Sequence, residues 1–237
     1  MRPVGRLPQR EPAMNLLPFA LLGAVCGLDV VSFPQAMLSR PIVACTLSGS
    51  LAGNAMSGLL LGAVLELIAL ETLPFGASRY PEWGSASVVG GALAGAVPQH
   101  THGAIAIAML GALATAWVGG WSMTVVRKWN GAWARALAPE LNVGSARSVI
   151  GLQLKGLTTD FVRGGLLTLV ALLALKPIAT AVIALWHVPP RVSGAVIVGV
   201  AATVAVGATW KVFHGTRGAG LVFAVGLAIG LALVALK

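Results

Sequence analysis

Residues 58–73 have the sequence GLLLGAVLELIALETL, an apolar run that holds two carboxylates, Glu66 and Glu71. A charge at the centre of a bilayer costs at least ~2.5–3.5 kcal/mol to insert. If this run lies in lipid, Glu66 must therefore face a cavity or a partner group. The fold class depends on whether the rest of the chain also has the composition of a membrane protein.

The composition of the whole chain indicates a multi-spanning membrane protein. Of its 237 residues, 57% are hydrophobic and only 10% are charged, whereas soluble domains carry about a quarter charged residues. Two cysteines are too few for a disulfide scaffold, and the low charge excludes a disordered chain. The net charge of +9 comes from basic residues spread between apolar runs. We therefore expect no nucleic-acid partner and interpret these residues as orientation signals and headgroup contacts.

The apolar runs predict an all-α, polytopic bundle that forms one membrane-embedded domain, residues 1–237. A helix needs about 20 apolar residues to cross the hydrocarbon layer, and the alternating polarity of β-barrel strands is not evident. Five apolar pieces precede residue 127, and the third and fourth are short and interrupted by Gly, Glu and Pro. They are residues 14–31, 42–57, 58–73, 84–97 and 104–126.

The distribution of Lys and Arg predicts the orientation of the chain. Three arginines precede the first apolar run, which predicts a cytoplasmic N-terminus. The connection 127–156 carries five basic residues against Glu140 alone, so we expect a cytoplasmic, amphipathic segment lying on the membrane surface. An even number of crossings must lie between the two, so one short piece within 14–126 is predicted to be a re-entrant hairpin. Residues 157–237 supply the C-terminal spans.

Glu66 is the strongest candidate for a functional side chain. Its carboxylate can accept hydrogen bonds from two hydroxyls of a polyol. The alternative is a structural cap that satisfies backbone N–H groups in a broken helix. Glu71 lies about 140° further round an ideal helix, so an acid–base pair is not supported. Glu71 is expected to contact substrate or to pair near the interface with Arg79 or Arg40.

The remaining motifs suggest structural roles. Asp29 lies at the end of the first span, and Asp160 is expected at the N-terminus of a later helix, where an acid is favoured. Residues 79–84, RYPEWG, are typical of an aromatic interfacial loop, with Glu82 as a pairing group. The 100–102 segment, HTH, has no further ligand nearby in sequence, so we expect no metal site and no cofactor.

The stretch around Glu66 closely resembles the membrane-embedded IIC component of the mannose/fructose/sorbose family of bacterial phosphotransferase systems. The match is specific over residues 40–95 and looser over 98–170, and the last third agrees only in its span pattern. The residues that carry it are Arg40–Leu47 (RPIVACTL), Gly49, Gly53, Asn54, Gly58–Leu70, Gly76-Ala77 and Pro81-Glu82, where the family has Pro-Asp.

This resemblance implies a sugar permease subunit of the bacterial cytoplasmic membrane that works beside a IID membrane subunit. Soluble IIA and IIB domains would phosphorylate the sugar, and IIC–IID pairs would form a higher oligomer. Glu66, on the re-entrant hairpin, would orient the sugar hydroxyls. Asn54 and Thr46 would add hydrogen bonds, and the glycines at 58, 62 and 76 would act as hinges.

The chain itself is expected to be a conduit without a catalytic residue. Cys26 and Cys45 lie inside apolar spans, where a thiol stays protonated and inert, so neither is a plausible phosphoacceptor. Two other functions stay open. One is a self-sufficient, proton-coupled secondary transporter in which Glu66 and Glu71 titrate. The other is a non-transporting membrane scaffold or regulatory subunit.

Overall fold

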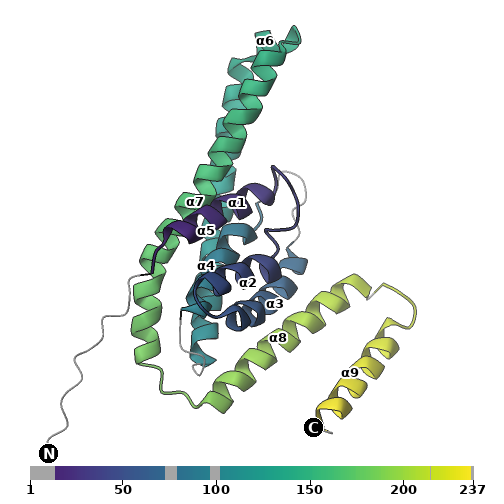
Figure 1. Cartoon of the computed structure of the whole chain (residues 1–237). Helices are drawn as coiled ribbons and strands as arrows, with labels where there is room; N and C mark the ends of the chain where they lie inside the picture. Colours follow the sequence, from purple (N-terminus) through teal and green to yellow (C-terminus); the bar gives the residue numbers. More distant parts are fainter. Residues whose placement is uncertain (1–13, 73–78, 97–101, 214, 236–237) are drawn as a thin grey trace, which may run out of the picture.

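In the computed structural model, the described residues are 14–72, 79–96, 102–213 and 215–235, and they form an all-α bundle (Figure 1). Most helices lie within the apolar runs of the sequence, whereas α5 and α7 extend into the basic segment between those runs. Their bounds are α1 Leu17–Asp29, α2 Pro41–Leu51, α3 Ala55–Glu71, α4 Trp83–Gly95, α5 His102–Ala136, α6 Ala138–Asn142, α7 Ala146–Ala184, α8 Pro190–Phe213 and α9 Ala219–Ala235. The five apolar pieces predicted before residue 127 each correspond to a helix.

The centre of the bundle is α4, whose 13 residues are all buried. Its sequence WGSASVVGGALAG is rich in small side chains, which let neighbouring backbones approach closely. A Cβ atom added to Gly91 would lie 2.3 Å from the carbonyl oxygen of Cys45 in α2. The small side chains of α4 therefore allow α1, α2, α3, α5 and α7 to pack around it.

Helices α2 and α3 form a tight antiparallel hairpin. The turn between them needs Gly53, which has φ +98°, a conformation that favours glycine. Asn54 then caps α3, since its side-chain oxygen accepts a hydrogen bond from the Ser57 N–H at 3.1 Å. A Cβ on Gly58 would lie 2.2 Å from the Cys45 carbonyl oxygen. Gly58 and Gly62 thus serve close packing inside the hairpin. Their predicted role as hinges stays a prediction, and Gly76, the third predicted hinge, lies outside the described residues.

Two long antiparallel helices, α5 and α7, form the second part of the core. They contain 35 and 39 residues, about 52 and 58 Å of helix. In the described part of the chain, these two are long and apolar enough to cross a membrane. Their connected ends project beyond the other helices, with α6 at the tip (Figure 1).

This helical pair corrects two predictions. Residues 127–136 continue α5, and α7 already begins at Ala146, so 127–156 forms the projecting tip of the pair and not a separate surface helix (Figure 1). Asp160 lies well inside α7 and not at a helix N-terminus. The true N-cap of α7 is Ser145, whose side chain accepts a hydrogen bond from the Ser148 N–H.

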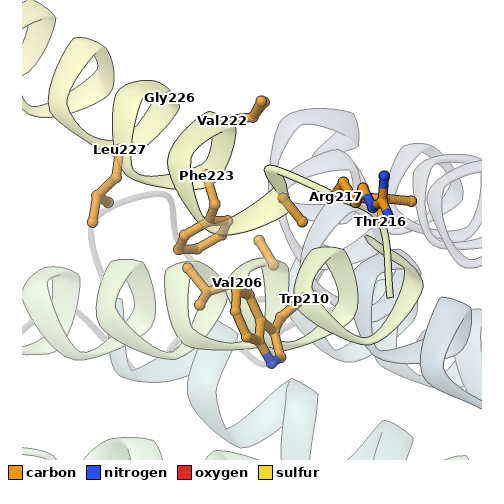
Figure 2. Close-up of a pocket in the computed structure, with 10 residues that line it drawn as sticks. Val206, Trp210, Thr216, Arg217, Val222, Phe223, Gly226 and Leu227 are labelled. Atoms are coloured by element: carbon orange, nitrogen blue, oxygen red, sulfur yellow. The ribbon is translucent and has the colours of Figure 1, made fainter. Parts of the chain in front are cut away.

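The C-terminal helices are less integrated into the bundle. Helix α8 packs against α3 and α5, whereas α9 diverges from it after a short turn (Figure 1). Near that turn, the rings of Trp210 and Phe223 meet edge to face, with centroids 6.1 Å apart. They line a mostly apolar cavity of about 510 Å³ between the two helices (Figure 2).

Candidate functional site

An ion pair between Arg40 and Glu66 lies at the open end of the α2–α3 hairpin. Arg40 is the N-cap residue of α2, and Glu66 lies in the C-terminal half of α3. The second carboxylate oxygen of Glu66 accepts a hydrogen bond from the backbone N–H of Ile42 at 3.2 Å. One carboxylate thereby joins the N-terminus of α2 to the C-terminal half of α3.

The pair suits the electrostatics of the hairpin. The first N–H groups of a helix have no partner within it, and a negative charge is favoured there. Glu66 supplies both a hydrogen-bond acceptor and a negative charge at the N-terminus of α2, so it does act as a structural cap. Its side chain nevertheless stays 17% exposed, and that of Arg40 36% exposed. The carboxylate is therefore held in place and still accessible.

The other predicted pairings differ from expectation. Arg40 pairs with Glu66; the side chain of Glu71 lies outside what the structure describes, so its predicted pairing stays a prediction. The guanidinium of Arg79 lies over the ring of Trp117, 4.9 Å from its centroid, a cation–π contact.

Thr46 and Asn54, the other predicted substrate contacts, lie progressively further along the hairpin. The Thr46 hydroxyl donates a hydrogen bond to the Ile42 carbonyl oxygen at 2.6 Å, one turn from the Ile42 N–H that binds Glu66. Asn54 lies twelve residues before Glu66, about 18 Å along α3. Because hydrogen bonds reach about 3 Å, Asn54 and Glu66 do not meet at one monosaccharide.

The predicted interfacial loop at residues 79–84 is in fact largely interior. Tyr80 and Trp83 are buried, and the Glu82 side chain is fully buried. Glu82 caps α4: both of its carboxylate oxygens lie 3.2 Å from the Ser85 backbone nitrogen. Its own backbone N–H donates to the Ala116 carbonyl oxygen in α5 at 2.9 Å. Glu82 therefore anchors α4 against α5 and does not pair at an interface.

A second polar group, which we call the α7 cluster, consists of Asp160, Arg163, Ser32, Ser122 and the carbonyl of Gly27. Asp160 Oδ1 lies 3.5 Å from Arg163 Nε, and both residues are buried. The Ser32 hydroxyl donates to Asp160 at 2.6 Å. Arg163 donates to the Gly27 carbonyl at 3.2 Å and to the Ser122 hydroxyl at 3.5 Å. The cluster joins α1, the loop after it, α5 and α7.

Asp29, at the end of α1 as predicted, organises the loop that leads to Arg40. Its carboxylate accepts hydrogen bonds from the N–H groups of Ala36 and Ser39, at 2.6 and 2.9 Å. The Ser39 hydroxyl adds a third, at 2.8 Å. Since Ser39 directly precedes Arg40, this loop fixes the start of α2 and with it the Arg40–Glu66 pair.

Sequence reasoning missed the α7 cluster. The i,i+3 spacing of Asp160 and Arg163 was a usable signal for a pair on one helix face. Their partner Ser32 lies 128 positions away, however, and no local pattern connects it to Asp160. As for metals, no group of three His, Cys, Asp or Glu side chains able to hold an ion occurs among the described residues; His100 lies outside them.

The all-α fold, with its long apolar helices and a buried ion pair inside the bundle, is that of a membrane protein. Residues 13–208 match the family model of the PTS system sorbose-specific IIC component. Because this match covers most of the chain, the protein belongs to that family of membrane-embedded phosphotransferase components of the bacterial inner membrane. The resemblance noted around Glu66 is thereby confirmed.

Curated relatives agree with this assignment. The chain is 31% identical over 97 residues to the fructose permease IIC component of Bacillus subtilis, and 30% identical over 96 residues to the sorbose-specific EIIC component of Klebsiella pneumoniae. The mannose-specific EIIC component of Escherichia coli K12 is 30% identical over 89 residues. These matches cover 41%, 40% and 38% of this chain and 36%, 35% and 33% of the relatives. The chain thus spans about a third of the length of the relatives it matches.

Two solved structures share the fold. One, described as a membrane protein, has a TM-score of 0.64 at 22% identity and covers 96% of both chains. The other is the cryo-EM structure of the mannose transporter ManYZ in complex with microcin E492, with a TM-score of 0.59 at 20% identity. That alignment covers 97% of this chain and 89% of the other. At these identities the likeness supports the fold alone.

Proposed function

We propose that this chain is the IIC permease subunit of a sugar phosphotransferase system, and that it binds and moves a hexose-type sugar together with a IID subunit. Soluble IIA and IIB domains phosphorylate the sugar, so the chain needs no phosphoacceptor of its own. The observation that carries the proposal is the accessible Glu66 carboxylate, held by Arg40 on a hairpin of a IIC-family membrane protein.

The α2–α3 hairpin has the dimensions of a re-entrant element. Its helices contain 11 and 17 residues, about 16 and 26 Å, and both are shorter than the ~30 Å hydrocarbon layer. They are antiparallel and joined by the tight turn at Gly53. We propose that the hairpin enters and leaves the membrane on one side, which puts Glu66 and Arg40 together at its mouth. The positive-inside bias favours a cytoplasmic N-terminus. With both hairpin helices re-entrant, an even number of crossings before 127–156 requires that one of the two 13-residue helices, α1 or α4, also does not cross; each spans only about 20 Å.

Glu66 has the capacity to bind sugar hydroxyls without releasing its protein partners. A carboxylate offers about four acceptor positions, and the structure uses one oxygen for Arg40 and the other for the Ile42 N–H. The remaining lone pairs suit two hydroxyl donors of a polyol. Thr46 lies one turn along α2 and completes the proposed site. We assign Asn54 to capping α3 and not to the sugar site. Contact between Glu71 and the substrate remains a prediction.

The partner subunits have candidate surfaces. Helix α9 stands apart from the bundle and exposes large apolar side chains, such as Leu221 and Val222 (Figure 1). We propose that IID covers part of this region; the similar ManYZ structure is that of a two-subunit transporter. The basic tip of α5 and α7, residues 127–156, is proposed as the landing surface for an acidic soluble IIB domain. IIC–IID pairs are proposed to assemble into a higher oligomer.

Uptake of labelled sugar in cells that also express IID, IIA and IIB tests the proposal. We expect uptake in the complete system and none from vesicles that contain this chain alone, even with an imposed pH gradient. Gradient-driven uptake by the chain alone would establish a proton-coupled transporter instead. Calorimetry on a co-purified IIC–IID pair addresses the scaffold alternative, because a scaffold without a site gives no heat on addition of sugar.

A further inference from the structure

A long groove between α5 and α7 is not used by the proposed sugar site. It has a volume of about 880 Å³ and is lined by side chains of both helices, among them Trp121, Trp129, Lys155, Arg163 and Leu166. Along α7 it extends from Lys155 to Val170, which are fifteen residues or about 22 Å apart. The groove thus exceeds the ~15 Å of one leaflet's hydrocarbon, half of the ~30 Å layer.

The groove has an exposed cation at one end and is mostly apolar along the rest, where the polar lining residues are Ser122 and Arg163, the latter paired with Asp160. Lys155 is exposed at the polar end, where its ammonium lies 3.9 Å from the Trp133 ring centroid. The neighbouring hydroxyl of Thr158 is exposed too. The wall beyond them is formed by Val125, Val162, Leu166 and other aliphatic side chains. A ligand that fills this space must combine an anionic head with a long apolar tail.

The charges around the groove leave Lys155 available for that head. Asp160, the acid on the same helix, is taken up by Arg163 and by the Ser32 hydroxyl. Within the described residues, no carboxylate forms an ion pair with Lys155. Lys155 lies against Trp133, less than two helical turns along α5 from Arg127 and Lys128, where the apolar run of α5 ends. This level is where headgroup phosphates are expected, and a basic side chain that reaches the bound phosphate is worth about fivefold in binding an anionic lipid. Lys155 lines the groove, whereas Lys128 does not and is not expected to reach that phosphate.

We infer that the groove binds one anionic phospholipid, with its phosphate at Lys155 and Thr158 and an acyl chain along Val162, Leu166 and Val170. A transmembrane helix of a partner is the alternative occupant, and the titration on the complex with IID tests it. Trp121 and Trp129, both half exposed, flank the groove at positions typical of side chains that contact the lipid interface. The inference depends on membrane embedding and is independent of sugar transport.

Native mass spectrometry of the full chain in mild detergent tests this inference. Phosphatidylglycerol and phosphatidylcholine of equal chain length are titrated separately, and we expect one tightly held phosphatidylglycerol. Lys155→Ala is expected to weaken phosphatidylglycerol binding about fivefold, with phosphatidylcholine little changed. Leu166→Trp, which fills the apolar channel, is expected to weaken both lipids. The matched control Lys128→Ala removes a cation outside the groove and is expected to stay within about twofold of the wild type.

Three outcomes of the titrations on the chain alone would overturn the inference. They are equal affinity for the two lipids, an equal loss from Lys155→Ala and Lys128→Ala, and binding that survives Leu166→Trp. Thermal unfolding of each variant shows whether the bundle is intact, and Leu166→Phe replaces Leu166→Trp if the larger ring disturbs it. The titration is repeated on the complex with IID. Loss of the bound lipid there would make the groove a subunit interface and would equally dismiss the lipid site.

Discussion

Arg40 and Glu66 form an ion pair that connects the first turn of α2 to the C-terminal half of α3, although they are 26 positions apart in sequence. One carboxylate thus closes the open end of the hairpin and caps α2 through the Ile42 N–H. The same oxygens are exposed enough to meet a ligand. A purely structural role and a substrate-binding role therefore make different predictions for variants of the pair.

Two changes to the pair separate these two roles: neutralising Glu66, and exchanging the charges of Arg40 and Glu66. Glu66→Gln should leave membrane insertion intact, because the amide oxygen can still accept from Ile42, but should lower sugar uptake at least about tenfold, the effect of losing ~1.4 kcal/mol of binding. The double variant Arg40→Glu with Glu66→Arg restores an ion pair but moves the carboxylate to α2. We expect uptake to stay low in the double variant, measured at matched membrane levels of protein.

Recovery of uptake in the double variant would show that the pair acts only as a structural link. Arg79→Gln is the matched control, because it removes a cation of the same kind that contacts Trp117 and lies outside the hairpin. Its uptake is expected to remain within about twofold of the wild type, since an exposed cation–π contact is worth ~0.5–1 kcal/mol.

Packing inside the hairpin gives a second prediction. Gly58→Ala puts a Cβ 2.2 Å from the Cys45 carbonyl oxygen, so α2 and α3 must separate, at a cost of ~1–3 kcal/mol. We expect a lower midpoint of thermal unfolding in mild detergent. Gly199→Ala is the control, because nothing lies within 4 Å of its added Cβ, and the higher helix propensity of alanine should slightly raise the midpoint. Equal midpoints for the two variants would contradict the close contact described for α2 and α3.

The Glu82 cap of α4 gives a third prediction. Glu82→Ala removes the acceptor for the Ser85 N–H in a fully buried position, and loss of such a cap costs ~0.5–2 kcal/mol. Glu82→Asp keeps a carboxylate at the N-cap, so we expect it to unfold closer to the wild type than Glu82→Ala does, again by thermal unfolding. An alanine variant as stable as the wild type would mean that the carboxylate does not stabilise α4.

Most helices were predictable because they follow from an apolar run; α6 and the outer turns of α5 and α7 do not. Asp29 at the end of α1 and the shortness of α3 and α4 followed from the same pattern. The start of α7 was also encoded locally, since Gly144 and Ser145 are a turn and an N-cap before Ala146. The apolar-run criterion ignored these signals, because the first turns of α7 are too polar to count as a span.

The pairing of charged residues was not predictable in the same way. The antiparallel register of α2 and α3, which is set by Gly58 against Cys45, brings Arg40 to Glu66. No local pattern reports that register. Glu82 was likewise assigned to an interface because its neighbours are aromatic, whereas the small residues of α4 draw the whole segment into the bundle.

The α7 cluster gives a fourth prediction. Large effects on stability are expected because both charges are buried. Removing one partner of a buried ion pair leaves the other uncompensated and costs ~3–5 kcal/mol, while replacing both by neutral groups costs less. Asp160→Asn and Arg163→Gln should each lower the midpoint of thermal unfolding strongly. The double variant should lose less stability than the sum of the two single losses, since directly contacting residues couple by ~0.5–3 kcal/mol. Additive losses would show that the 3.5 Å approach of Asp160 and Arg163 contributes no interaction of its own. Ser32→Ala removes the hydroxyl that donates to Asp160 but removes no charge. Its loss of stability should therefore be smaller than that of either single charge variant.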